Sequence, residues 1–260
     1  MTKLRDAIYG FAVADALGVP FEFKDRGTFI CCDCVGFGTW NQEPGTWSDD
    51  TSMTLATCKS IKDKNKIDLE DIRKNFKSWL FNDDFTADGK VFDVGGTTRE
   101  ALTLNQGMDD YYSNGNGSLM RILPLAFTDA SDAEIEEISA ITHAHEISRK
   151  ACIDYVHLAR KLIAGEDLED LGFDEIKNKN EDAIQSTGFV LHTLEAAIWC
   201  ILNTSSYKEA VLKAVNLGDD TDTTAAVTGG LAGIIYGYDE IPREWIDKLK
   251  NKKLIEDCLF

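Results

Sequence analysis

Apolar residues along this chain recur mostly at intervals of three and four positions, the spacing that places side chains on one face of an α-helix. The widest such stripe runs from Val190 to Leu202. The same spacing occurs in four further segments, residues 4–14, 69–80, 152–162 and 227–235. Pro242 stands in the position of a first-turn proline ahead of another apolar stretch that ends at Leu249. The pattern therefore predicts an all-α fold.

Strand patterns are scarce, and the best candidate is the short segment 28–35. Glycine-rich or polar breaks separate the helical stretches at residues 36–50, 83–96, 109–118 and 218–222. Loops on a rigid helical scaffold commonly carry functional groups, so we expect the site among these breaks. The acidic segment 166–182 is expected to be a solvated excursion. No linker or repeat divides the chain, so we expect one compact helical domain over residues 1–260.

The net charge of -18 constrains the class of partner. Such a surface repels phosphate backbones and anionic lipid, which argues against general nucleic-acid or membrane-surface binding. An anionic ligand would need local help against this field, from cations or from helix N-termini.

The seven cysteines include a cluster of Cys31, Cys32 and Cys34, but no second pair completes a zinc site. We therefore expect free thiols and a cytoplasmic location. The apolar N-terminal run is interrupted by Asp6 and Asp15, which argues against a secretory signal, and no segment is long enough to span a membrane. The motif Gly229-x-x-x-Gly233 is interpreted as close packing of two helices.

Two groups of aspartates stand directly before helical stretches, Ser48-Asp49-Asp50-Thr51 and Asp219-Asp220-Thr221-Asp222. Simple helix capping explains either group alone. Crowded carboxylates repel one another, however, and a cation relieves that repulsion. The second group lacks the glycine and the distal glutamate of an EF-hand loop, so that kind of calcium site is excluded.

A third acidic residue, Glu22, closes the turn after the first predicted helix. Carboxylates and hydroxyls are hard ligands, which favours Mg²⁺ or Mn²⁺ over zinc. Five carboxylates are candidates to converge, namely Glu22, Asp49, Asp50, Asp220 and Asp222. Together these carboxylates carry five negative charges. Two divalent ions would leave one of the five uncompensated, whereas one ion would leave three, so the charge balance favours two metals.

At these residues the chain resembles the ADP-ribosylglycohydrolase family. The family's early Thr/Ser-Asp-Asp-Thr motif is Ser48 to Thr51 here, and its late Asp-x-Asp-Thr motif is Asp220 to Thr223. Further segments match in the same order, namely Asp15-Ala16-Leu17-Gly18, Asp93-Val94-Gly95, Asn116-Gly117-Ser118-Leu119-Met120-Arg121, Thr142-His143 and Gly188-Phe189-Val190. These matches span residues 3 to 237, and their order makes the resemblance specific.

The resemblance implies a helical fold whose cleft holds two Mg²⁺ or Mn²⁺ ions. It assigns the metals to Ser48, Asp49, Asp50, Asp220, Asp222 and Thr223. It places ADP-ribose against Asn114, Gly115, Asn116, Gly117, Ser118, His143 and Phe189. Phe189 is either an adenine platform or a core residue, and His143 is either a ligand contact or a structural histidine.

The resemblance implies hydrolysis of the glycosidic bond between ADP-ribose and a target, with arginine the expected linkage and a monomeric enzyme acting on an ADP-ribosylated protein or small molecule. Glu22 is the first candidate for the base that activates water or for a switchable metal ligand, and Asp93 is the alternative. Asp219 replaces a common glycine, and either adds charge near the metals or points to solvent.

Two competing functions remain open. A two-metal phosphohydrolase of a nucleotide diphosphate would use similar ligands, and would release AMP rather than ADP-ribose. A non-catalytic ADP-ribose-binding protein would bind without turnover. The leaving group itself, whether arginine, serine, a nucleic-acid base or a small molecule, cannot be derived from the sequence.

Overall fold

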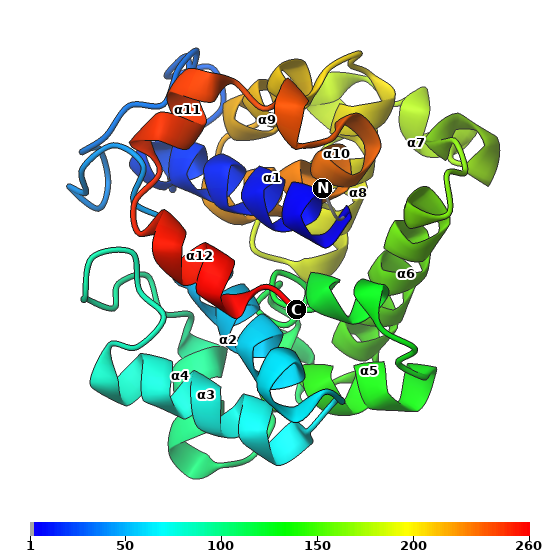
Figure 1. Ribbon diagram of the computed structural model, residues 1–260. Coiled ribbons are helices and arrows are strands. Elements are labelled where there is room, and N and C mark those ends of the chain that lie inside the picture. The colour runs from blue at the N-terminus through cyan, green and yellow to red at the C-terminus, as the bar shows by residue number, and fades with distance from the viewer. Residues whose placement is uncertain (1–2) are drawn as a thin grey trace.

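The chain folds around a pair of helices from opposite ends of the sequence, α1 and α10, in a computed structural model that describes residues 3–260 (Figure 1). The α-helices are α1 (Lys3–Gly18), α2 (Asp49–Lys64), α3 (Leu69–Asn82), α4 (Gly96–Leu104), α5 (Asp132–Ser139), α6 (Glu146–Ile163), α7 (Asp174–Lys177), α8 (Val190–Leu202), α9 (Tyr207–Asn216), α10 (Thr221–Tyr236), α11 (Arg243–Lys248) and α12 (Lys252–Cys258). Short 3-10 turns η1 to η6 occur at Val19–Phe21, Tyr111–Ser113, Leu123–Phe127, Leu168–Leu171, Glu181–Ala183 and Tyr238–Glu240. The prediction of an all-α fold is confirmed.

Glycines allow α1 and α10 to touch backbone to backbone. A Cβ atom added at Gly10 would lie 2.4 Å from the carbonyl oxygen of Gly229, and one added at Gly233 would lie 2.4 Å from that of Asp6. Only hydrogen fits in such a contact, so glycine is required at these crossings. The interpretation of the Gly229-x-x-x-Gly233 motif as helix packing is confirmed.

The remaining helices surround this pair. Helices α8 and α9 pack against α10, while α2 and α3 pack against each other and α12 lies along α2 (Figure 1). Helix α6 contacts α8 and α10 on one side and α5 on the other, and α5 in turn contacts α3. Helices α1, α2 and α10 also contact one another, which brings the ends of all three to one buried location.

The predicted strand at residues 28–35 is wrong, because this segment is an irregular loop. The side chain of Asn216 takes the place of a neighbouring strand as the hydrogen-bond partner of this backbone. The amide of Asn216 at the end of α9 accepts a hydrogen bond from the Cys31 N–H (2.8 Å) and donates one to the Cys31 carbonyl (2.9 Å). Backbone groups satisfied in this way need no neighbouring strand.

The acidic segment 166–182 forms the short elements η4 and α7 and enters η5, and most of its residues are exposed. All seven cysteines are free thiols, as expected. Over residues 3–260, no helix combines the length and the apolar character needed to cross a bilayer.

Candidate active site

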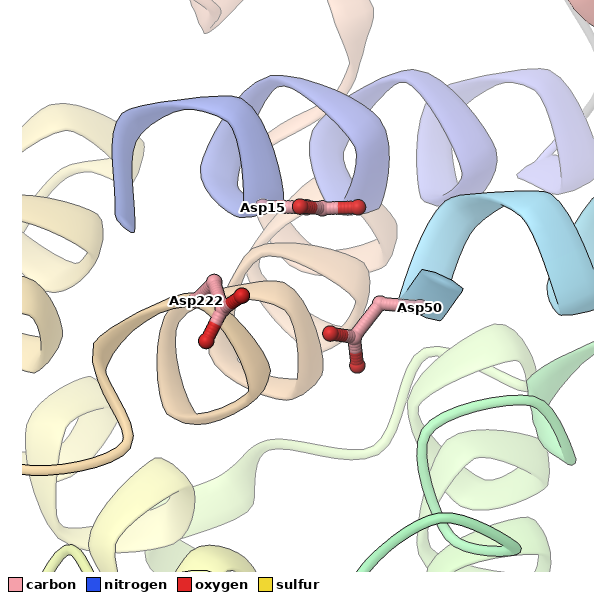
Figure 2. Close-up of side chains that lie close together, drawn as sticks. All are labelled: Asp15, Asp50 and Asp222. Carbon is pink, nitrogen blue, oxygen red and sulfur yellow. The ribbon is translucent and has the colours of Figure 1, made fainter. Parts of the chain in front are cut away.

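Carboxylates from three helices converge beneath a cleft. Asp15 comes from α1, Asp50 from the first turn of α2 and Asp222 from the first turn of α10 (Figure 2). One oxygen of each lies within 4.8 Å of the others. Glu22, Asp220 and Asp222 form a second group by the same measure, so Asp222 belongs to both. Carboxylates that are separated by some 200 positions in the sequence therefore lie close together in the fold.

The electrostatics of this cluster favour a bound cation. Burial, and then repulsion by neighbouring carboxylates, raise the pKa of Asp50 and of Asp222 well above the usual value. Asp50 Oδ1 and Asp222 Oδ2 are buried and have no hydrogen-bond partner among the described residues. An unpaired buried carboxylate oxygen is costly, and a hard divalent cation satisfies it. The donor set, all oxygen, fits Mg²⁺ or Mn²⁺.

Hydroxyl groups orient the Asp50 carboxylate. Ser48, the N-cap of α2, donates its hydroxyl to Asp50 Oδ2 (3.0 Å), and Thr223 of α10 donates to the same oxygen (3.2 Å). Oδ1 is thereby left for another partner. Asp49 lies beside Asp50, buried at the cleft wall, where burial and Asp93 raise its pKa. Ser48, Asp49 and Thr223, all predicted as ligands, thus surround the cluster.

Asp15 is a site residue that the ligand predictions omitted. Its carboxylate accepts hydrogen bonds from the Ser48 N–H (2.9 Å) and from the Thr51 N–H (3.1 Å) and hydroxyl (2.5 Å). It therefore binds the free amides at the start of α2 and fixes that helix to α1. Burial raises the pKa of Asp15 to about 7, although these hydrogen bonds lower it. An aspartate within the apolar stretch from Phe11 to Leu17 was the available signal.

Glu22 is buried at the end of η1 and receives a hydrogen bond from the indole N–H of Trp40. Burial and the nearby Asp93 raise the pKa of Glu22 to about 9, and the Trp40 hydrogen bond opposes this rise. The loop that carries Trp40 is itself fastened here, because Thr39 donates to the carbonyls of Glu22 (2.7 Å, hydroxyl) and Pro20 (3.2 Å, amide).

Asp93 faces the same group of carboxylates from the loop before α4. It adopts a left-handed backbone conformation (φ 52°), which is uncommon for a residue other than glycine. Burial raises its pKa, while hydrogen bonds with Asp222 and Glu22 lower it. Its placement beside Glu22 is consistent with the acid or base role that the sequence predicted.

Asp220 is held by Asn116. The Asn116 amide donates to Asp220 Oδ2 (2.7 Å) and to the Thr193 hydroxyl (2.9 Å). This places Asn116 between the carboxylate cluster and the cleft, so it orients a candidate ligand as well as facing the ligand space. The neighbouring Asp219 is exposed and has a left-handed backbone (φ 61°), so its charge points to solvent.

A cleft of about 440 Å³ opens above the cluster. Its wall combines carboxylates with the glycine-rich turn and His143. Its wall includes Glu22, Phe23, Trp40, Asp49, Asp93, Thr98, Gly115, Asn116, Gly117, His143, Gly188, Asp220 and Thr223. Most of the residues predicted to hold metal or ADP-ribose thus share one cavity.

Three members of the predicted ADP-ribose set have other partners. Ser118 is fully buried behind the cleft, where the hydroxyl of Ser139 donates to it (3.0 Å). Asn114 accepts from the Ser148 hydroxyl (2.9 Å) and so fastens the loop to α6. The backbone N–H of Asn116 donates to the Gly188 carbonyl (2.9 Å), so this amide is engaged within the protein.

Phe189 borders a second hollow of about 510 Å³ that shares Gly115 and Gly188 with the cleft. Its half-buried ring packs edge-on against His192, with centroids 5.0 Å apart. Tyr111 and Tyr112 line the same hollow and are 62% and 94% exposed. Exposed aromatic rings in a polar loop were the signal by which these two residues, absent from the sequence predictions, could have been found.

Comparisons with known proteins show the family of the chain. The profile described as ADP-ribosylglycohydrolase matches residues 1–259. The ADP-ribosylarginine hydrolase Tri1 of Serratia proteamaculans is 33% identical, over 99% of this chain and 78% of its own length. The ADP-ribosyl-[dinitrogen reductase] glycohydrolase of Rhodospirillum rubrum is 32% identical, over 95% of this chain and 90% of its own.

Solved structures give the same result. The structure titled "ADP-ribosylglycohydrolase-related protein complex" superposes with a TM-score of 0.83 at 28% identity, and the match covers 98% of this chain and 95% of that one. The resemblance inferred from the ordered motifs is therefore confirmed.

Proposed function

Because the chain belongs to the ADP-ribosylglycohydrolase family and is an ADP-ribosyl glycohydrolase, we propose that it hydrolyses arginine-linked ADP-ribose with two Mg²⁺ or Mn²⁺ ions. One observation supports the metal dependence. Two clusters of three carboxylates each have Asp222 in common, and the buried oxygens Asp50 Oδ1 and Asp222 Oδ2 have no hydrogen-bond partner among the described residues. Arginine is proposed because the Tri1 relative bears that linkage in its name.

The proposed ligands are Ser48, Asp49, Asp50, Asp220, Asp222 and Thr223. Bound there, divalent cations would neutralise the carboxylates, orient sugar hydroxyls and lower the pKa of water. Asp15 is proposed as the residue that holds the first turn of α2 in register with α1, rather than as a direct ligand, because Ser48 and Thr51 already donate to its oxygens.

In the proposed reaction, water attacks the anomeric carbon of the ribose while the bond to the guanidinium nitrogen breaks. Glu22 accepts the proton of the attacking water, and Asp93 is the alternative base. The acidic wall stabilises the positive charge that develops on the sugar. The departing guanidine nitrogen keeps the electrons of the broken bond and receives the proton that Glu22 took from water, so the products are ADP-ribose and an unmodified arginine guanidinium, and Glu22 is ionised again.

Binding of the diphosphate and the adenine is assigned to the glycine-rich turn and to the aromatic residues near it. Gly115 and Gly117 permit close approach of a diphosphate to the backbone, and His143 faces the same space. Phe189, with Tyr111, offers an aromatic surface for the adenine. The seven free thiols fit a reducing cytoplasm.

The test is a hydrolysis panel. Protein stripped with EDTA is supplied with Mg²⁺ or Mn²⁺ and given peptides bearing ADP-ribose on arginine or on serine, and an ADP-ribosylated oligonucleotide. We expect free ADP-ribose from the arginine-linked peptide only when metal is present. Release of AMP would instead identify a phosphohydrolase, and metal-independent binding without turnover would identify a non-catalytic ADP-ribose-binding protein.

A further inference from the structure

Arg121 is a fully buried cation without a carboxylate partner among the described residues. Its guanidinium stacks on the ring of Phe76 (4.4 Å to the centroid) and donates to the Ile138 carbonyl (3.1 Å) and to the Thr142 hydroxyl (2.7 Å). A buried charge destabilises the folded state, so the presence of Arg121 behind the ligand cleft requires an explanation.

The Thr142 hydroxyl connects this cation to His143. Its oxygen lies 2.8 Å from His143 Nδ1. Arginine can only donate hydrogen bonds, so the Thr142 oxygen must accept from Arg121. The proton of the hydroxyl then has one acceptor in reach among the described residues, which is Nδ1. A proton on Nδ1 would leave the buried hydroxyl without an acceptor, and such a donor destabilises the folded state.

The same arrangement keeps the imidazole neutral. Burial, and then the nearby Arg121 guanidinium, lower the pKa of His143 to about 3. A neutral imidazole that accepts at Nδ1 carries its proton on Nε2.

Nε2 faces the ligand cleft. No described residue forms a hydrogen bond with it, and it lies beside Gly115 and Gly117. A Cβ atom on Gly117 would lie 2.8 Å from His143 Cε1, so glycine at this position keeps the imidazole edge uncovered. The backbone of His143 is also fixed, because Met108 exchanges hydrogen bonds with Thr142 and Ala144 (2.9 and 2.7 Å).

We propose that Arg121 and Thr142 are positioning residues that fix the His143 tautomer with its proton on Nε2, so that a neutral histidine donates a hydrogen bond to an anionic oxygen of the ligand. The ligand part rests on the proposed function, in which the diphosphate of ADP-ribose lies against the Gly115–Gly117 turn. A donor of this kind offsets the repulsion between an anionic ligand and a strongly acidic protein without adding a charge near the carboxylate cluster.

The tautomer is tested by long-range ¹H–¹⁵N correlation spectroscopy of protein labelled with ¹⁵N-histidine, with the His143 signals assigned by their loss in His143→Gln. We expect an unprotonated Nδ1 and a protonated Nε2 in the wild type. Thr142→Val should abolish this single tautomer, while Thr142→Ser should retain it. A proton on Nδ1 in the wild type, or an unchanged tautomer in Thr142→Val, would overturn the proposal.

The ligand contact is tested by calorimetric titration with ADP-ribose. Thr142→Val should raise the Kd about 10-fold, as expected for a lost hydrogen bond to a charged oxygen, and Thr142→Ser should restore affinity. Thr228→Val is the matched control, because its buried hydroxyl donates to the Thr224 carbonyl (2.7 Å) and forms no hydrogen bond with Arg121, Thr142 or His143. Equal affinity of all variants would refute the contact.

Failure of the proposed function and failure of the tautomer proposal can be distinguished. If the wild type does not bind ADP-ribose, the proposed function and the ligand contact fail together. The spectroscopic measurement still decides whether Thr142, the residue to which Arg121 donates, sets the tautomer, because it requires neither ligand nor metal.

Discussion

The indole N–H of Trp40 donates a hydrogen bond to Oε2 of Glu22, the proposed base. The Trp40 ring also packs between Phe23 and Phe92, with centroids at 6.2 and 5.8 Å. An N–H donor stabilises the ionised carboxylate, and it also fixes the direction of its second oxygen. A residue outside the predicted set therefore orients a predicted one and favours its ionised form.

We expect Trp40→Phe to lower kcat about 10-fold while KM changes little, because the ring contacts persist and one hydrogen bond to a charged group is lost. Steady-state kinetics on the arginine-linked peptide measures the two constants separately. Phe92→Leu is the control, since it disturbs the same aromatic contact but leaves the donor. Equal losses in both variants would mean that Trp40 acts through packing alone.

Asp222→Asn should separate metal binding from folding. Asp222 belongs to both carboxylate groups, so its replacement should weaken Mn²⁺ binding at least 100-fold and abolish most turnover. The same change removes a buried like charge, so the Tm of the metal-free protein should rise. Calorimetry and thermal unfolding measure the two effects.

Asp219→Asn is the matched control for this variant. Asp219 lies three positions away, but it is exposed, and asparagine tolerates its left-handed backbone. Metal affinity and Tm should match the wild type. A comparable loss of metal binding in this variant would point to a general effect of charge rather than to ligation by Asp222.

Without metal, the protein should become less stable as the pH rises. The pKa of Asp15 is raised to about 7 and that of Glu22 to about 9, so the folded state holds protons that the unfolded chain has already lost. A carboxyl group whose pKa is raised by folding makes its full contribution to stability below the pKa that it has in the unfolded chain, near 4. This contribution is lost as the pH rises through the pKa that the group has in the folded state. The Tm in EDTA should therefore fall between about pH 5 and pH 9, whereas Mn²⁺ should flatten this dependence.

Gly229→Ala should destabilise the protein by about 1–3 kcal/mol or more, because its Cβ would lie 2.4 Å from the Gly10 carbonyl oxygen and force α1 away from α10. Separation of these helices also moves Asp15 away from Asp222, so metal affinity should fall in parallel. Gly96→Ala is the control, since no atom outside its immediate neighbours lies within 4 Å of its Cβ. Urea unfolding compares the variants.

The sequence alone predicts the helices well, because their apolar stripes are local properties of the chain. It also predicts the carboxylates of the 48–51 and 220–223 motifs, since adjacent like charges before a helix need an explanation. It does not predict that Asp15 binds the amides at the start of α2, because that contact depends on how α1 crosses α10. Trp40 and Tyr111 were missed for the same reason, since a single aromatic residue in a loop carries no periodic signal.

The direct contact of α1 with α10 has a consequence for biosynthesis. Asp15 precedes Asp222 by 207 positions, so a nascent chain that ends before Asp222 lacks a member of both carboxylate groups. Completion of the cluster therefore requires that α10 has been synthesised and has docked on α1. Where metal binding requires the docked helices, free cation concentration also sets how much of the newly made protein remains folded.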